Sequence, residues 1–171
     1  MSLWGILPGE PQLYGWVIGR ASPEVIAVFR WVNYLGSRWI LAPALPLLFW
    51  AVPAARKRWW LWVGAMALAP ILEDLAKLVV GRPRPEGVAF GFPSGHVTAA
   101  AVFFPMAAYL IGKSLGPRRA VGALWTGAFV MVLLVGIARL VLRAHWPADV
   151  LGGAALGLAA ASAAIRWNER H

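Results

Sequence analysis

The sequence predicts an all-α integral membrane protein, a bundle of five transmembrane helices preceded by an N-terminal interfacial or short sixth helix. Hydrophobic residues make up 60% of its 171 residues and charged residues only 13%, whereas a soluble domain has roughly a quarter of its residues charged. Apolar runs close to the roughly 20 residues that cross a bilayer recur along the chain. The length fits one membrane-embedded domain, with an N-terminal segment (residues 1–37) and a helical core (residues 38–167).

Five apolar runs are the predicted transmembrane helices. They are Trp39–Ala55, Trp59–Gly81, Gly95–Gly112, Ala120–Ala138 and Ala148–Trp167. Polar or basic segments separate them, so successive helices should run in opposite directions through the bilayer. In the last run, Gly153 and Gly157 form a Gly-xxx-Gly pair. We expect this pair to serve close packing inside the bundle rather than a dimer contact.

The N-terminal segment has a clear helix start but a short helix. Ser22, Pro23 and Glu24 combine an N-cap residue, a first-turn proline and an acidic first turn. Gly36 is expected to end this helix just after Leu35. A helix of about thirteen residues reaches only about 20 Å, which is too short to span alone. The segment therefore either lies at the membrane interface or completes a short sixth span with part of residues 3–20.

Basic residues orient the predicted bundle. The formal net charge is +9, and because the basic sites lie between apolar runs, anionic lipid headgroups are the expected partners rather than nucleic acid. One side holds eight of these residues and the other holds five: Arg56, Lys57, Arg58, Lys113, Arg118, Arg119, Arg166 and Arg170 against Arg38, Arg82, Arg84, Arg139 and Arg143. The first side is expected to be cytoplasmic. Trp39 and Trp146 are expected at the outer interface, without a chemical role.

Two junctions on the predicted outer side hold most of the reactive groups. The junction between the second and third runs contains Lys77, Arg82, Arg84, Pro93, Ser94, Gly95 and His96; the junction between the fourth and fifth contains Arg139, Arg143, His145 and Asp149. Several cations with two imidazoles and one carboxylate suit a multiply charged anion, for which phosphate is the obvious candidate. Arg82 and Arg143 are expected to contact solvent or headgroups rather than the anion.

The first junction offers groups that bind phosphate. Ser94 precedes an apolar run and can act as an N-cap or turn residue. The N–H groups at that helix start, with Gly95 allowing close approach, can bind phosphate oxygens. Lys77 lies in an apolar helix, where an ionisable group is costly without a partner, so it is a functional candidate. Arg84 and Arg139 can each bind two oxygens through the guanidinium fork.

The second junction offers a nucleophile with an orienting group. His145 and Asp149 are four residues apart, and Pro147 between them is expected to open the last helix. The carboxylate would then reach one ring nitrogen of His145 and fix its tautomer. The other ring nitrogen would be free to attack phosphorus, as in catalytic triads.

Three patterns in this order and spacing resemble the signatures of the type 2 phosphatidic acid phosphatase superfamily. They are Lys77 with Arg84-Pro85, then Pro93-Ser94-Gly95-His96, then Arg139 with His145 and Asp149, spread over residues 77–149. One position departs from the family pattern, because the third signature usually begins with Ser-Arg and here Ala138 precedes the arginine. The missing hydroxyl removes one hydrogen bond to phosphate or to a neighbouring loop, which bears on substrate class and rate.

The resemblance implies catalysis through a phosphohistidine. His145 would attack phosphorus and Asp149 would orient it, while His96 would protonate the leaving lipid oxygen and then activate water. The negative charge of the transition state would be held by groups of both junctions: Lys77, Arg84, Ser94, Gly95 and Arg139. The family needs no metal, and the few carboxylates of this chain do not make a hard-cation cage. No cofactor is expected.

The leading hypothesis is a phosphatase of a lipid phosphate or pyrophosphate, such as undecaprenyl pyrophosphate, phosphatidate or phosphatidylglycerol phosphate. We expect it in a prokaryotic inner membrane with the active site on the outer face. Two alternatives stay open: a lipid phosphotransferase that uses the same intermediate, and a non-catalytic protein that binds or transports an anionic lipid. No oligomeric state is predicted.

Overall fold

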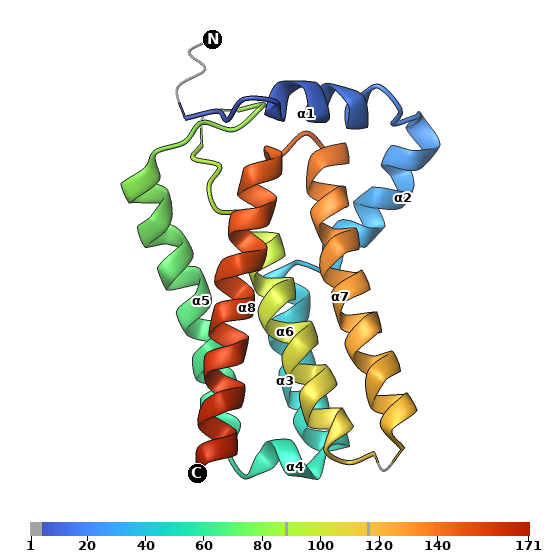
Figure 1. Cartoon of the computed structure of the whole chain (residues 1–171), viewed down its shortest axis with the longest axis vertical. Helices are drawn as coiled ribbons and strands as arrows, with labels where there is room; N and C mark the ends of the chain where they lie inside the picture. The colour runs from blue at the N-terminus through green and yellow to red at the C-terminus, as the bar shows by residue number, and fades with distance from the viewer. Residues whose placement is uncertain (1–4, 88, 116) are drawn as a thin grey trace.

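The computed structural model describes residues 5–87, 89–115 and 117–171 as a helical bundle (Figure 1). Residues 1–4 of the predicted N-terminal segment therefore lie outside the described residues. In chain order the helices are α1 (Glu10–Ile18), α2 (Pro23–Tyr34), α3 (Arg38–Ala51), α4 (Pro53–Arg56), α5 (Trp59–Val80), α6 (Gly95–Gly112), α7 (Arg118–Val141) and α8 (Pro147–Arg170). The described residues form no strand, only an isolated bridge between Pro83 and Phe90.

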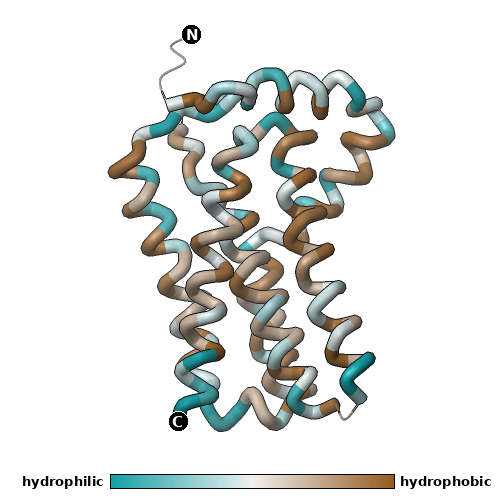
Figure 2. The backbone as a smooth tube through the Cα atoms, in the orientation of Figure 1, coloured by the Kyte–Doolittle hydropathy of each residue, from teal (hydrophilic) through white to brown (hydrophobic). Residues whose placement is uncertain are grey.

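Three of the described helices, α6, α7 and α8, are long and apolar enough to cross a membrane. Helix α5 has 22 residues and carries Glu73, Asp74 and Lys77 toward its C-terminal end, and the apolar helix α3 has 14. The predicted all-α bundle with apolar spans is thus confirmed, whereas the count of five spans remains a prediction. Figure 2 shows hydrophobic residues along the length of the bundle, with hydrophilic residues at both ends: the end with α4, the C-terminus of α8 and the start of α7, and the end with α1.

Helix α6 forms the centre of the bundle. It contacts α3, α5, α7 and α8, and ten of its 18 residues are buried. Among the largest fully buried side chains are Met106 and Leu110 of α6 and Trp62 of α5. Because α6 is surrounded on all sides, its first residues are held at a fixed place inside the bundle, below the end that α1 covers (Figure 1).

The N-terminal segment forms two short helices. The Ser22 hydroxyl accepts a hydrogen bond from the Val25 N–H (3.4 Å), and α2 starts at Pro23 as predicted. It ends at Tyr34, before Gly36. Helix α1 lies across the end of the bundle rather than in line with α2 (Figure 1). This arrangement favours the interfacial alternative for α1.

The Gly-xxx-Gly pair packs inside the bundle, as predicted. A Cβ atom on Gly153 would lie 2.5 Å from the carbonyl oxygen of Ser94, and one on Gly157 would lie 2.6 Å from Cβ of Ala101. Both contacts are with α6 or its N-cap residue. The two glycines therefore let α8 approach α6 at backbone distance, which brings the starts of the two helices together.

We predict that Gly157→Ala lowers the melting temperature of the detergent-solubilised protein. The new methyl group would overlap Ala101, and overpacking of this kind costs about 1–3 kcal/mol. Gly127→Ala on α7 is the matched control, since no heavy atom lies within 4 Å of a Cβ placed there and alanine favours a helix. Equal melting temperatures for the two variants in thermal unfolding would contradict the packing described.

Candidate active site

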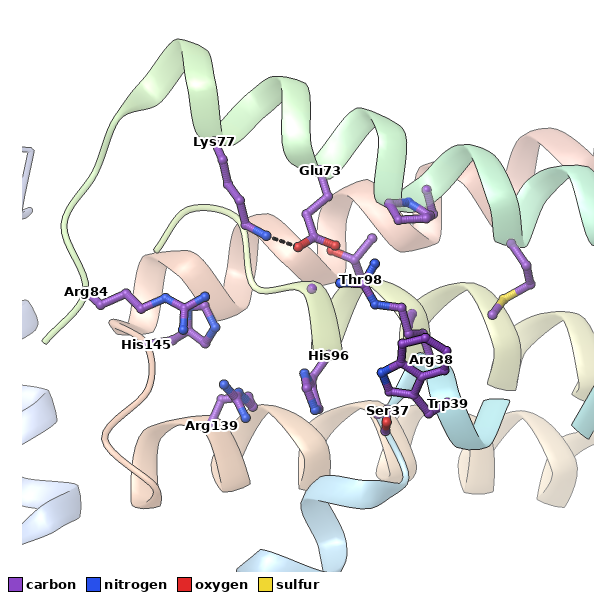
Figure 3. Close-up of a pocket in the computed structure, with 16 residues that line it drawn as sticks. Ser37, Arg38, Trp39, Glu73, Lys77, Arg84, His96, Thr98, Arg139 and His145 are labelled. Carbon is purple, nitrogen blue, oxygen red and sulfur yellow. Dashed lines mark hydrogen bonds and ion pairs between the residues drawn. The ribbon is translucent and has the colours of Figure 1, made fainter. Parts of the chain in front are cut away.

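A cavity of about 250 Å³ lies where both predicted junctions meet (Figure 3). Its walls come from α3, α5, α6, α7 and the two loops that precede α6 and α8. It is lined by six of the predicted site residues: Lys77, Arg84, Gly95, His96, Arg139 and His145. The two imidazoles, one from the first turn of α6 and one from the α7–α8 loop, therefore face the same space.

His145 is backed by Asp149 at the start of α8. Nδ1 of His145 lies 3.4 Å from Oδ2 of Asp149, and the two side chains are 2% and 0% exposed. Oδ2 also accepts the Trp146 N–H (2.9 Å), which caps α8 and fixes the carboxylate. With Nδ1 turned to Asp149, Nε2 is the ring nitrogen of His145 left for the cavity.

The environment of His145 favours the neutral imidazole. Burial lowers the pKa of His145 below its ordinary value, and the neighbouring Arg139 and Arg84 act in the same direction. The hydrogen bond to Asp149 opposes them. A neutral imidazole near pH 7 is the form that has a lone pair for attack.

The cations of the cavity are held in place by neighbours. Lys77 is ion-paired with Glu73, which also lines the cavity, and its Nζ lies 3.5 Å from Oδ1 of Asp74. Nε of Arg84 donates to the carbonyl oxygen of Phe90 (3.1 Å). Nη1 of Arg139 donates to Oδ1 of Asn33 in α2 (2.6 Å). Within the described residues neither Arg84 nor Arg139 pairs with a carboxylate, so their charge and their remaining donors can serve an anion.

Ser94 and Asp149 lie behind the cavity wall rather than in it. Ser94 occupies the N-cap position of α6 and is fully buried, but its hydroxyl makes no hydrogen bond with the residues that the structure describes. Its N–H donates to the carbonyl oxygen of Asp149 (2.9 Å). This backbone bond joins the second sequence pattern to the third.

Arg82 is not a solvent-facing loop residue, contrary to the prediction. It is 3% exposed, donates from Nη1 to Oδ1 of Asp149 (3.0 Å) and is ion-paired with Glu10 of α1. By contrast, Arg143 forms an exposed ion pair with Glu86 (3.3 Å), as expected of a loop residue. The sequence places both arginines in short loops between apolar runs, so only their partners distinguish them.

The α2–α3 junction is a wall of the cavity that the sequence did not reveal. Gly36, Ser37, Arg38 and Trp39 line it, and α3 begins partway along the bundle (Figure 1). A Cβ on Gly36 would lie 2.8 Å from the carbonyl oxygen of His96, so the junction touches the start of α6. Trp39 therefore borders the cavity while 83% of it stays exposed, and its place at the outer membrane interface remains a prediction.

Trp146 has a structural partner that the sequence did not reveal. It is 7% exposed and its Nε1–H donates to the carbonyl oxygen of Pro83 (3.1 Å). This bond joins the loop before α8 to the loop before α6. Its place at the outer membrane interface remains a prediction.

Comparison with known sequences gives consistent matches. The model of the family described as the PAP2 superfamily matches residues 88–171. The chain is 31% identical over 146 residues to phosphatidylglycerophosphatase B of Bacillus subtilis (strain 168), covering 80% of this chain and 72% of that protein. It is 32% identical over 146 residues to decaprenylphosphoryl-5-phosphoribose phosphatase of Mycobacterium tuberculosis, covering 79% and 76%.

Two solved structures share the fold. The transmembrane PAP2 type phosphatidylglycerolphosphate phosphatase from Bacillus subtilis superposes with a TM-score of 0.87 at 27% identity, covering 95% of this chain and 85% of that one. Aquifex aeolicus LpxE superposes with a TM-score of 0.74 at 22% identity, covering 94% and 97%. The helical bundle described above is therefore the architecture of membrane PAP2 phosphatases.

We predict that Asn33→Leu weakens the binding of orthovanadate, a phosphate-shaped anion, by about three- to tenfold. The Arg139 guanidinium would lose the partner that fixes it, and because Asn33 acts through Arg139, only part of the about 1.5–3 kcal/mol of a hydrogen bond to a charged group would be lost from binding, about 0.7–1.4 kcal/mol. Titration calorimetry in detergent measures the change. Asn168→Leu is the control, because Asn168 bonds to Arg58 and Tyr109 outside the cavity. An unchanged affinity for Asn33→Leu would show that Arg139 does not depend on α2.

Proposed function

Because the chain belongs to the PAP2 superfamily, we propose that it is an integral membrane phosphatase that hydrolyses a lipid phosphate or pyrophosphate through a phosphohistidine on His145. The similar proteins are named as phosphatases of phosphatidylglycerophosphate and of a decaprenylphosphoryl ribose phosphate. Hydrolysis of a phosphate ester on a membrane lipid is common to both names. The proposal extends that chemistry to this chain and assigns it to particular residues.

The observation that carries the proposal is the cavity itself. Two histidines from distant parts of the chain face one space, and four cations line the same space: Arg38, Lys77, Arg84 and Arg139. One of the histidines, His145, has a buried carboxylate behind it. A dianionic phosphate would be attracted by the cations, and His145, with Asp149 in contact with its Nδ1, has the oriented imidazole that a nucleophile needs.

In the first step the Nε2 lone pair of His145 forms a bond to phosphorus while the bond from phosphorus to the leaving oxygen breaks. His96, which enters this step as the imidazolium, gives one proton to that oxygen and becomes neutral, so the lipid leaves as a neutral alcohol, or as a lipid monophosphate if the substrate is a pyrophosphate. The proton on Nδ1 stays in the hydrogen bond to Asp149, which stabilises the positive charge that develops on the ring.

In the second step His96 accepts a proton from water as the water oxygen attacks phosphorus. The bond to Nε2 breaks, inorganic phosphate leaves and His145 returns to its neutral state. Lys77, Arg84 and Arg139 stabilise the equatorial oxygens in both steps, together with the Gly95 N–H at the start of α6. Lys77 has three donors, so it can keep Glu73 and still bind phosphate.

Ala138, the departure from the family pattern, is fully buried in α7 and does not line the cavity. The alanine is therefore compatible with the proposed nucleophilic attack.

The substrate headgroup is proposed as phosphatidylglycerol phosphate, with phosphatidate and undecaprenyl pyrophosphate as the other candidates. The support is the 31% identity over 80% of the chain to a protein named for the first of these lipids. No metal is proposed to take part, since the site is rich in cations and the described residues hold no cluster of three histidine or carboxylate ligands.

We predict that His145→Ala lowers phosphate release from phosphatidylglycerol phosphate at least about 1000-fold, because no other group replaces the nucleophile. A chelator should leave the wild-type rate unchanged. The assay measures inorganic phosphate in detergent over the three candidate lipids, with His171→Ala as the matched control. Activity that survives His145→Ala would remove this residue from its role, and labelled phosphate on an acceptor lipid instead of in water would identify a phosphotransferase.

The proposed location is a prokaryotic inner membrane, with five spanning helices and the cavity toward the outer face. The basic residues of α4, of the start of α7 and of the end of α8 lie at the opposite end of the bundle from α1 (Figure 1). That end is expected to be cytoplasmic, because short cytoplasmic loops carry the excess of lysine and arginine.

The lack of cysteine in the sequence makes this orientation easy to test. We predict that Glu86→Cys, in the loop before α6, reacts with a membrane-impermeant maleimide on intact cells, whereas Ser114→Cys, after α6, reacts only once the membrane is opened. Both positions are exposed. The reverse labelling pattern would place the cavity on the cytoplasmic side.

A further inference from the structure

Two buried charges, Glu10 and Arg82, have no role in the mechanism proposed above. Glu10 is 6% exposed at the start of α1, and Arg82 is 3% exposed in the loop before α6. They form an ion pair with each other. Removing charges from water is costly unless they are well paired, so a buried pair outside the reacting cavity calls for an explanation.

The pair is joined directly to Asp149. Nη1 of Arg82 donates to Oδ1 of Asp149 (3.0 Å), and the opposite oxygen, Oδ2, faces His145 and accepts the Trp146 N–H. Each carboxylate oxygen therefore has its own partner. Because Arg82 occupies Oδ1, the carboxylate cannot rotate without breaking an ion pair, and Oδ2 stays turned toward the imidazole.

Glu10 in turn fixes Arg82 and the start of α8. Its Oε1 accepts the Ala148 N–H (2.7 Å), in the first turn of α8, and its Oε2 accepts the Leu7 N–H (2.7 Å) in addition to the ion pair. One carboxylate thus connects α1, the loop before α6 and α8. It also places a negative charge at a helix N-terminus, where the helix dipole favours it.

The charges balance in a way that suits a nucleophile. Arg82 alone would neutralise Asp149 and reduce the support that the carboxylate gives to a developing imidazolium. Glu10 offsets the charge of Arg82, so the three groups together keep one net negative charge next to His145. We propose that Glu10 and Arg82 form a charge-balanced clamp that positions Asp149 for His145; this inference rests on the proposed function of His145.

The clamp predicts a shift in the pKa of His145, and the direction of the shift depends on whether Glu10 or Arg82 is replaced. Glu10→Gln leaves the positive charge of Arg82 without its counter-charge, which lowers the pKa of His145. Arg82→Gln removes a positive charge near Asp149, which raises it. Shifts of at least about 0.5 pH unit are expected, since charges interact strongly in a buried site. The double variant loses one charge of each sign and should return toward the wild-type value.

Other charged and titratable groups face His145 from the elements around it. They are Asp149 of α8, Arg84 of the loop before α6, His96 of α6, Arg139 of α7, Glu73 and Lys77 of α5, and Arg38 of α3. All of them are present in every variant. Differences between variants therefore report on the clamp alone.

The test uses nuclear magnetic resonance of the full chain in detergent, labelled at histidine. The chain has only three histidines, so His145 is assigned from the signal lost in His145→Ala. Its titration is followed in wild type, Glu10→Gln, Arg82→Gln, Arg82→Lys and the double variant. Arg82→Lys keeps the charge and should remain close to wild type.

The kinetics of phosphate release provide a second measurement on the same variants. A positioning role predicts that kcat falls about ten- to hundredfold in Glu10→Gln while KM stays within about twofold, because the nucleophile is misplaced but the phosphate cations are untouched. We expect kcat to fall in Arg82→Gln as well, and Arg82→Lys should recover most of the kcat that Arg82→Gln loses. A fall that Arg82→Lys shares in full with Arg82→Gln would count against a role of the charge.

Glu86 and Arg143 supply the matched control. They form an exposed ion pair, 59% and 50% exposed at the side chain, in the same two loops. Glu86→Gln and Arg143→Gln should leave the His145 titration within about 0.2 pH unit, since solvent screens exposed charges.

Shifts of opposite sign for Glu10→Gln and Arg82→Gln would support the clamp. Shifts of the same sign, or none, would overturn it even if wild type releases phosphate and His145→Ala does not. If wild type releases no phosphate from any of the lipids, the proposed function fails while the titration still decides the clamp. If the Glu10→Gln single variant misfolds, the double variant is compared with Arg82→Gln instead. The pKa of His145 must then be lower in the double variant than in Arg82→Gln, and an equal or higher pKa would overturn the inference.

Discussion

The arrangement of the site depends on Asp149, a fully buried residue whose polar atoms are shared among three parts of the chain. Its backbone carbonyl accepts the Ser94 N–H, its Oδ2 faces His145, and its Oδ1 accepts from Arg82. The three sequence patterns are thus joined through one residue. A buried carboxylate with this many donors is held in one orientation. The fixed carboxylate in turn fixes the orientation of the imidazole ring that contacts it.

The packing of α8 against α6 makes these bonds possible. Gly153 and Gly157 allow the two helices to approach at backbone distance, next to the residues that form the site. A larger side chain at either position would separate the Ser94 N–H from its acceptor. The packing of α8 against α6 therefore sets the geometry around the cavity, although no small residue of α8 lines it.

Apolar periodicity and the order of the motifs predicted the central helices, the start of α2 at Pro23 and the convergence of His96 with His145. These features follow from local rules of helix formation and from alternating helix direction. The partners of Arg82 and Arg139 could not be predicted in the same way, because Glu10 and Asn33 lie 72 and 106 residues from them in sequence. The hydrogen bond from Trp146 to Pro83 could not be predicted for a related reason, since these residues lie 63 positions apart.

The site is also spread over nearly the whole length of the chain. The Glu10 carboxylate accepts a hydrogen bond from the Ala148 N–H, 138 residues away, and His145 lies two residues before the start of α8. During biosynthesis the earlier helices would therefore enter the bilayer with Glu10 and Arg82 able to meet, while Asp149 is still to be made. A nascent chain that stops before α8 has every cation of the cavity but lacks the carboxylate that contacts His145, so insertion of α8 is the event that brings Asp149 to the imidazole.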